Sequence, residues 1–283
     1  MIAIQEILTS IDVGLIFGIV AIGIYLTFRT INFADLTCDG SFALGASVSA
    51  TLIVNGANPY LASIISLISG GIAGLLTGIL NIKFKIADLL SGIIIAFMLY
   101  SVNLRIMGNS PNITFAESDS IFASSCVSFT IFSIILCLTL IIVYLLFSRF
   151  GLRLRAIGYN KQFAAISGIN INSMTIAGVS SSNALIALGG SLFSQYQGFC
   201  DISQGFGTLV IGLTSVVIGE KIFSFKKEPL LIFSCVLGSI LYRIFINVAL
   251  HGNSLGIGTQ DLNLITGLIT IVAMLIRKKY KNA

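Results

Sequence analysis

The chain has 283 residues, of which 56% are hydrophobic and only 10% are charged, and its mean hydropathy is +1.01. Soluble domains carry about 25% charged residues, so this composition excludes a water-soluble globular protein and indicates a polytopic membrane protein. The net charge of +5 is therefore read first as a sign of orientation in the membrane. We expect membrane lipid around the chain and no nucleic acid partner.

Nine apolar segments are long enough, or nearly long enough, to cross a membrane as helices. They cover residues 9–28, 41–55, 60–82, 86–107, 127–147, 172–194, 206–223, 229–249 and 262–276. The second, seventh and ninth are short, so each could be tilted, broken or re-entrant, and the count lies between eight and ten. We expect the first segment not to be cleaved as a signal peptide. The residues before it include Glu6 and no Lys or Arg, whereas a signal peptide begins with a positively charged region. The fold class predicted is an all-α transmembrane helix bundle, with residues 1–283 in one domain.

Several glycines recur at helical spacing within these segments. Gly14 and Gly18 form one G-x-x-x-G pattern, and Gly70, Gly74 and Gly78 form two more. Small residues at this spacing let helix backbones approach closely in lipid. The pattern predicts a compact bundle and says nothing about a substrate.

The basic residues indicate how the chain is oriented. With nine crossings, all of the 16 lysines and arginines except Arg105 and Arg243 fall on one face. Because cytoplasmic loops are enriched in Lys and Arg, this face is predicted to be cytoplasmic. The N-terminus is then outside, and the short basic tail at 277–283 is cytoplasmic.

One cytoplasmic connection, residues 148–171, is longer and more polar than a connection needs to be. It contains Arg149, Arg153, Arg155 and Lys161 and no acidic residue, so it must lie at a membrane surface.

The second half of this connection can form only a short helix. Asn160 is suited to cap its start, Phe163 and Ile166 fall on one face, and Gly168 is placed to end it. Seven or eight residues at about 1.5 Å each reach roughly 12 Å, far short of the roughly 30 Å of a span. We interpret the connection as a surface element that a soluble partner contacts.

Polar residues in or beside the segments are candidates for a translocation path, because each costs free energy in a bilayer. Arg243 lies inside the eighth segment and should have a partner, for which Asp201 and Asp261 are candidates. A structural ion pair or a snorkelling arginine explains Arg243 at least as well as transport does. Asn183 could line an aqueous path or hydrogen-bond between helices. The candidate path or gate comprises Asn32, Asp35, Asp39, Asn183, Gln195, Gln197, Asp201 and Arg243.

No motif indicates catalysis. The chain lacks G-x-x-x-x-G-K-[ST], so it cannot by itself cradle nucleotide phosphates, and it lacks H-E-x-x-H and G-x-S-x-G. Asp35 and Asp39 flank a turn at the cytoplasmic end of the second segment, but without a nearby His or metal ligand they do not indicate acid–base chemistry. The cysteines show no metal-ligand spacing. We expect a non-catalytic chain with no metal and no cofactor of its own.

Three blocks of sequence occur in a characteristic order. The first is Thr27–Arg29 with Ile31–Ala46, the second contains Gly151–Gly158 and Gly168–Asn170, and the third lies between Ser182 and Glu220. Together they resemble permease subunits of bacterial ABC importers of the branched-chain amino-acid type. The third block is similar to the tryptophan/tyrosine-type subgroup, and the resemblance covers residues 10 to 275.

The resemblance implies a multi-pass permease domain in the bacterial inner membrane, forming the path for a small solute such as an amino acid. It implies an ATPase subunit that uses ATP below the cytoplasmic face, an extracytoplasmic solute-binding protein, and a second, identical permease copy. The loop would dock on the ATPase through Arg149, Arg153, Arg155, Asn160, Lys161, Phe163, Ala164, Ala165 and Gly168. It departs from the Glu-Ala-Ala loop of another importer group, so the coupling role is assigned to the loop as a whole.

A self-sufficient secondary transporter or channel is the alternative. It would need coupling carboxylates or broken helices near the midplane of the membrane. Most acidic residues of this chain lie near the ends of the predicted segments, and no inverted repeat is evident. The importer permease is therefore the favoured hypothesis.

Overall fold

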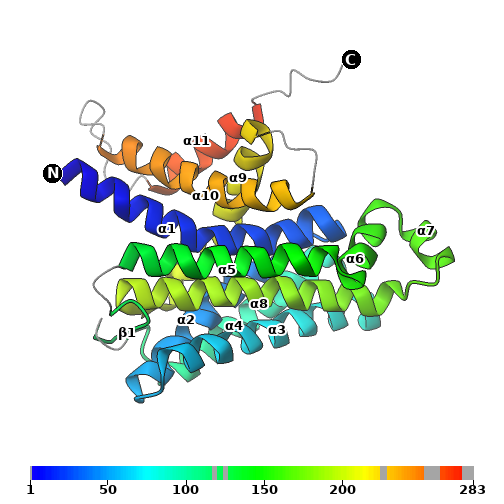
Figure 1. Ribbon diagram of the computed structural model, residues 1–283. Coiled ribbons are helices and arrows are strands. Elements are labelled where there is room, and N and C mark those ends of the chain that lie inside the picture. The colour runs from blue at the N-terminus through cyan, green and yellow to red at the C-terminus, as the bar shows by residue number, and fades with distance from the viewer. Residues whose placement is uncertain (1, 117–119, 124–126, 224–227, 252–261, 276–283) are drawn as a thin grey trace.

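The computed structural model describes residues 2–116, 120–123, 127–223, 228–251 and 262–275 (Figure 1). The chain order is α1 (Ile2–Ile24), the π-helix η1 (Tyr25–Ile31), α2 (Cys38–Val54), α3 (Pro59–Phe84), α4 (Asp88–Ile106), β1 (Asn112–Thr114), α5 (Val127–Phe147), α6 (Arg149–Tyr159), α7 (Lys161–Ile166), α8 (Ile171–Gln197), β2 (Phe199–Asp201), the 3-10 helix η3 (Ile202–Gly205), α9 (Thr208–Phe223), α10 (Glu228–His251) and α11 (Leu262–Leu275).

The central helix of the bundle is α2. Most of its side chains are buried, because α3, α4 and α8 pack around it. A β-carbon on Gly45 of α2 would lie 1.9 Å from the carbonyl oxygen of Ala187 on α8, and one on Gly190 would lie 2.1 Å from that of Phe42. Neither site has room for a side chain, so α2 and α8 contact each other backbone to backbone.

The glycine patterns of the sequence lie at helix contacts, as predicted. The backbone of α10 covers Gly14, whose β-carbon would lie 2.8 Å from the Ile240 α-carbon. Gly70 of α3 faces Ala187 of α8, while Gly78 faces Ile176. This pairing shows that α3 and α8 run antiparallel in close contact, as small residues permit.

The bundle has two distinct ends. In Figure 1, α6 and α7 project from one end, and β1 lies at the other. Because α3 runs antiparallel to α8, Lys83 and Lys85 lie beside the start of α8, at the α7 end. The structure thus gathers basic loops at this end, which the positive-inside rule places in the cytoplasm. The basic tail lies outside the described residues, and the sidedness of both termini stays a prediction.

The nine predicted apolar segments each contain a helix. Among the described residues, seven helices are long and apolar enough to cross a membrane, while α2 and α11 are shorter. The loop at 148–171 differs from the expectation of one short helix, since it forms α6 as well as α7, and α7 has six residues. The missed signal was the apolar spacing of Phe150, Leu154 and Ile157, whose last two side chains are buried.

The contact between α2 and α8 predicts that Gly45→Ala destabilises the chain. The added methyl group would overlap the Ala187 carbonyl group, and overpacking of this kind costs about 1 to 3 kcal/mol. We expect a lower melting temperature for the purified chain in detergent. Gly267→Ala is the matched control, because nothing lies within 4 Å of a β-carbon there. Equal melting temperatures for both variants would contradict this packing.

Candidate functional site

A buried hydrogen-bond network links the start of α2 to its neighbours. Asp35, in the loop before α2, is fully buried and accepts hydrogen bonds from the Thr37 amide at 2.8 Å and the Asn183 side-chain amide at 2.6 Å. The Asn183 side-chain oxygen accepts from the Ser41 hydroxyl at 2.7 Å. The Thr37 and Thr77 hydroxyls share a further bond of 2.7 Å. The network therefore joins α2, α3 and α8.

This network corrects the predicted depth of Asp35. The sequence placed it beside a turn at the cytoplasmic end of the second segment, whereas the structure pairs it with Asn183, near the middle of α8. The loop returns into the bundle after η1, where Asn32 takes a left-handed conformation with φ of 59°. Asp35 and Asn183 are both fully buried, so in this conformation they connect helices and do not face an open path.

Asp39, four residues further along the chain in the first turn of α2, has a different environment. Its carboxylate is partly exposed and accepts hydrogen bonds from the Gly207 amide at 3.2 Å, the Thr208 hydroxyl at 2.8 Å and the Leu209 amide at 2.9 Å. These donors are at the start of α9, so Asp39 satisfies that helix end from another element. Among the described residues, Asp39 forms no ion pair with a cation.

A groove of about 470 Å³ opens beside Asp39, between α2, α4 and the η3 segment. Its walls are mainly apolar and aromatic, and Phe97 and Phe206 are 75% and 72% exposed. The lining residues are Leu36, Asp39, Gly40, Ala43, Ile93, Ala96, Phe97, Tyr100, Asn103, Ile202, Gly205 and Phe206. A groove with apolar walls and a polar group of this kind is typical of small-molecule sites.

The remaining candidate path residues lie toward the β1 end. Gln195 is buried and donates to the hydroxyl groups of Ser49 and Ser63, at 3.0 and 2.9 Å. Gln197 accepts from the Gln204 side chain at 2.9 Å, close to where β1 pairs with β2. These contacts join α8 to α2, α3 and η3 at this end.

Arg243 does not form the ion pair expected with Asp201. Its guanidinium group lies over the Phe17 ring, 4.2 Å from the ring centroid, a cation–π contact. The Asp201 carboxylate accepts instead from the Ser203 amide at 2.7 Å. The other candidate, Asp261, lies outside the described residues. Within the described part of the chain, the aromatic ring is the contact that offsets the cost of burying Arg243.

The α7 segment forms an exposed apolar surface at the basic end. Asn160 caps α7 as predicted, with its side-chain oxygen accepting from the Gln162 and Phe163 amides at 2.9 and 3.0 Å. Phe163 and Ile166 are 64% and 87% exposed, and Tyr159 before the cap is 85% exposed. The helix ends at Ile166, before Gly168 takes a positive φ of 76°. We call Tyr159, Phe163 and Ile166 the α7 surface.

The loop residues divide into exposed and buried groups. Arg149, Arg153 and Lys161 are exposed, as are Ala165 and Gly168.

Two residues of the predicted docking set make internal contacts instead. Ala164 is fully buried, and Arg155 donates to the Leu146 carbonyl oxygen at 2.8 Å while its guanidinium lies over the Phe147 ring. The contribution of each loop residue to docking stays a prediction.

The α6 helix rests directly on the end of the first membrane segment. A β-carbon on Gly158 would lie 1.9 Å from the Thr30 carbonyl oxygen of η1, and one on Gly151 would lie 2.3 Å from Leu146. The α7 surface is therefore attached to η1 and to α5 through close backbone contacts.

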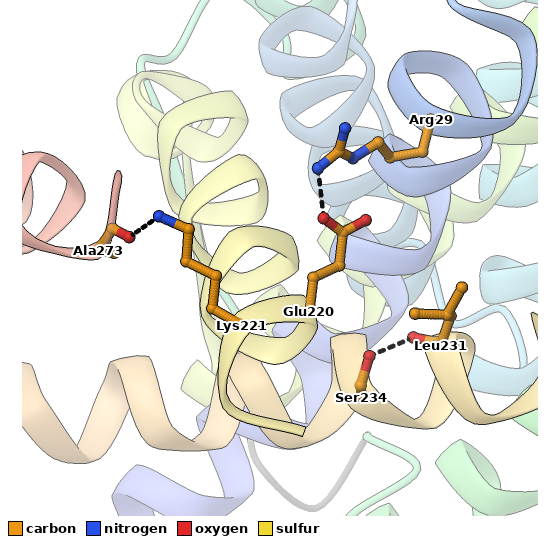
Figure 2. A network of polar contacts seen from close by, with 6 residues as sticks. All are labelled: Arg29, Glu220, Lys221, Leu231, Ser234 and Ala273. Atoms are coloured by element: carbon orange, nitrogen blue, oxygen red, sulfur yellow. Dashed lines mark hydrogen bonds and ion pairs between the residues drawn. The ribbon is translucent and has the colours of Figure 1, made fainter. Parts of the chain in front are cut away.

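Polar contacts that the sequence did not indicate lie next to this attachment (Figure 2). Arg29 of η1 forms an ion pair with Glu220 near the end of α9. The next residue, Lys221, points the other way and donates to the Ala273 carbonyl oxygen of α11. Two adjacent residues thus tie α9 to helices on opposite sides, and no spacing in the sequence could have indicated partners this far apart.

One family model matches almost the whole chain. The family described as branched-chain amino acid transport system / permease component matches residues 6–276. The tyrosine transport system permease protein of Clostridioides difficile (strain R20291) is 41% identical over 263 residues, covering 91% of this chain and 86% of that protein. The ribose import permease protein of Bacillus subtilis (strain 168) is 24% identical over 269 residues, covering 93% of this chain and 81% of that protein.

A solved structure, PsaBC from Streptococcus pneumoniae in complex with Fab, shows a similar fold. The TM-score is 0.58 with 13% sequence identity, and the match covers 97% of this chain and 91% of that chain.

The buried network predicts that Asn183→Leu strongly destabilises the chain. The change removes a donor to the Asp35 carboxyl group and the acceptor of the Ser41 hydroxyl, and removing one partner of a buried hydrogen bond costs about 1 to 3 kcal/mol. We expect a large fall in melting temperature in detergent. The control is Ser181→Ala on the same helix, where the hydroxyl bonds to its own helix at Gly178. A melting temperature for Asn183→Leu within one degree of the parent would contradict the role assigned to the network.

The Arg29–Glu220 pair predicts a small effect on stability. Its side chains are 54% and 21% exposed, and solvent-exposed ion pairs contribute roughly 0.2 to 1 kcal/mol. A double-mutant cycle with Arg29→Gln and Glu220→Gln should give a coupling energy in that range, measured by unfolding of the purified chain. A coupling above about 2 kcal/mol would show that the pair behaves as a buried one.

Proposed function

Since the chain belongs to the branched-chain amino acid transport system permease family, it is a membrane permease subunit of an ABC importer, and we propose that its solute is an amino acid. The family implies an ATPase partner and a solute-binding protein, and a multi-pass position in the bacterial inner membrane. ATP would be bound and hydrolysed by the ATPase subunit. The chain itself would contribute the path and the mechanical link to the ATPase.

The observation that carries the mechanical link is the α7 surface. It is apolar and highly exposed, yet it lies at the basic end of the bundle, beyond the helices long enough to span the membrane. Large exposed apolar side chains on a polar segment are typical of protein contacts. An ATPase below the cytoplasmic face would bury Tyr159, Phe163 and Ile166. Arg149, Arg153 and Lys161 around them would meet acidic groups of the partner.

The amino-acid solute is supported by the relative with 41% identity, which is a tyrosine transport system permease protein. That match covers most of both chains, so the membrane-embedded regions correspond as well as the loops. The ribose permease is more distant at 24% identity. An amino acid is therefore a better supported solute than a sugar.

The path would run between two copies of this chain. The groove beside Asp39 is open on one side, where Phe97 of α4 is 75% exposed. A second, identical copy facing this side would enclose a path that one chain leaves open. Light scattering of the purified complex, corrected for detergent, measures how many permease copies it holds.

The docking proposal predicts that Phe163→Glu weakens binding of the ATPase subunit. A charge on a central aromatic contact should cost at least about 2 kcal/mol, which corresponds to roughly thirtyfold in affinity. Copurification of the tagged chain with its ATPase, together with ATP-driven uptake in proteoliposomes, measures this loss. The chain itself should fold normally, because Phe163 is mostly exposed.

The matched control is Tyr60→Glu. Tyr60 is also aromatic and is 58% exposed, but it begins α3 at the opposite end of the bundle. It should leave ATPase binding unchanged. If Phe163→Glu binds the ATPase as tightly as Tyr60→Glu does, the α7 surface is not the docking site.

A further inference from the structure

The groove extends from Asn103 and Ile202, near the β1 end of the bundle, to Asp39, which lies about halfway along the bundle. The loop before α2 is fixed by Asp35 to Asn183, near the middle of α8, so α2 begins at this depth. The α9 helix begins at the same depth, because its first amides bond to Asp39. Two helices thus start inside the bundle next to one groove, which is the arrangement of solute sites built from discontinuous helices.

The Asp39 carboxylate has capacity for one more donor. Its Oδ1 atom accepts from the Thr208 hydroxyl and the Leu209 amide, while Oδ2 accepts from the Gly207 amide at 3.2 Å. A carboxylate offers about four acceptor positions. No Lys or Arg is among the residues that line the groove, and the ion pair recorded in the described part of the chain lies elsewhere. An ammonium group in the groove would occupy the remaining acceptor position and form an ion pair with the carboxylate.

The walls of the groove suit a large apolar or aromatic side chain. Phe97 and Tyr100 are one turn apart on α4, and Phe206 faces the groove from the segment before α9. The rings are 75%, 45% and 72% exposed, so a ligand can cover them. Aromatic rings pack well against another ring in offset or edge-to-face geometry. The volume of about 470 Å³ lies within the range of small-molecule pockets.

We propose that this groove is half of the solute site, binding an aromatic amino acid with its ammonium group at Asp39 and its side chain against Phe97, Tyr100 and Phe206. This inference rests on the proposed function and adds the class of side chain and the residues that select it. Small amino acids would keep the contact with Asp39 but lose the aromatic contacts. Aromatic acids without an amino group would keep the ring contacts but bring a negative charge toward Asp39.

The test uses the permease–ATPase complex in lipid nanodiscs, without the solute-binding protein, so that the selectivity of that protein does not contribute. Equilibrium binding of tritiated tyrosine should be saturable. Alanine and 3-(4-hydroxyphenyl)propanoate, which is tyrosine without its amino group, should each compete at least about tenfold less well than unlabelled tyrosine. Phe97→Ala and Asp39→Asn should each weaken tyrosine binding about tenfold or more.

The matched control is Met98→Ala. Met98 is the next residue on α4 and is 58% exposed, but it does not line the groove, so its variant should bind tyrosine within twofold of the parent. Asp39 also accepts hydrogen bonds from the first amides of α9, so Asp39→Asn could impair folding. A second variant therefore tests the site without changing this contact. Tyr100→Ala changes a partly exposed wall residue and should weaken tyrosine binding while alanine binding stays constant.

The inference is overturned if tyrosine shows no saturable binding, if alanine competes equally, or if Phe97→Ala and Tyr100→Ala bind tyrosine like Met98→Ala. A separate measurement distinguishes this failure from failure of the proposed function. The same complex, supplied with ATP and its solute-binding protein in proteoliposomes, should take up amino acids. If the parent complex takes up amino acids and the groove variants do so at the same rate, the assignment of the solute site to the groove is refuted and the proposed function stands. If the parent complex shows no ATP-driven uptake of amino acids, the proposed function is refuted.

Discussion

The hydrogen bond between Asp35 and Asn183 is the interaction on which the centre of this bundle depends. Non-helical backbone is tolerated at membrane depth only where protein surrounds and satisfies it. The loop at residues 32–37 meets this condition because Asp35 bonds to the Thr37 amide and to α8. With the loop fixed at this depth, α2 can begin inside the bundle, and Asp39 then lies where it can receive the start of α9.

Much of this fold could be predicted from the sequence, because apolar segment length and the placement of Lys and Arg are local properties that the bilayer imposes. The exposed helix capped by Asn160 followed from a local capping pattern. The depth of Asp35 and Asp39 could not be predicted, since it depends on hydrogen bonds to groups more than 140 residues away in the sequence. Arg243 shows the same limit: the need for a partner was evident, but among the described residues the Phe17 ring of α1, and not Asp201, makes the contact.

The structure provides a continuous set of contacts from the α7 surface to the groove. The α6 helix rests on η1 at Gly158, and η1 leads into the loop that holds Asp35. Arg29 of η1 is paired with Glu220 of α9, and the other end of α9 bonds to Asp39. In the proposed function, displacement of α7 by the ATPase would reach the groove along both routes. Such coupling needs packed elements that move as units. The first route runs through the close backbone contact at Gly158, whereas the second depends on one partly exposed ion pair.

The backbone contact between α2 and α8 has a consequence for how this subunit can change shape. Two helices separated by side chains can slide as rotamers adjust, but Gly45 and Gly190 leave no side chains in between. Together with α3, which lies as close to α8 at Gly70, they form a rigid frame. Opening the groove first to one side of the membrane and then to the other must therefore involve movement of helices outside this frame, such as α4 and α9. Spectroscopic labels on α3 and α8 would keep a fixed separation through a transport cycle and so provide the reference against which the moving helices can be measured.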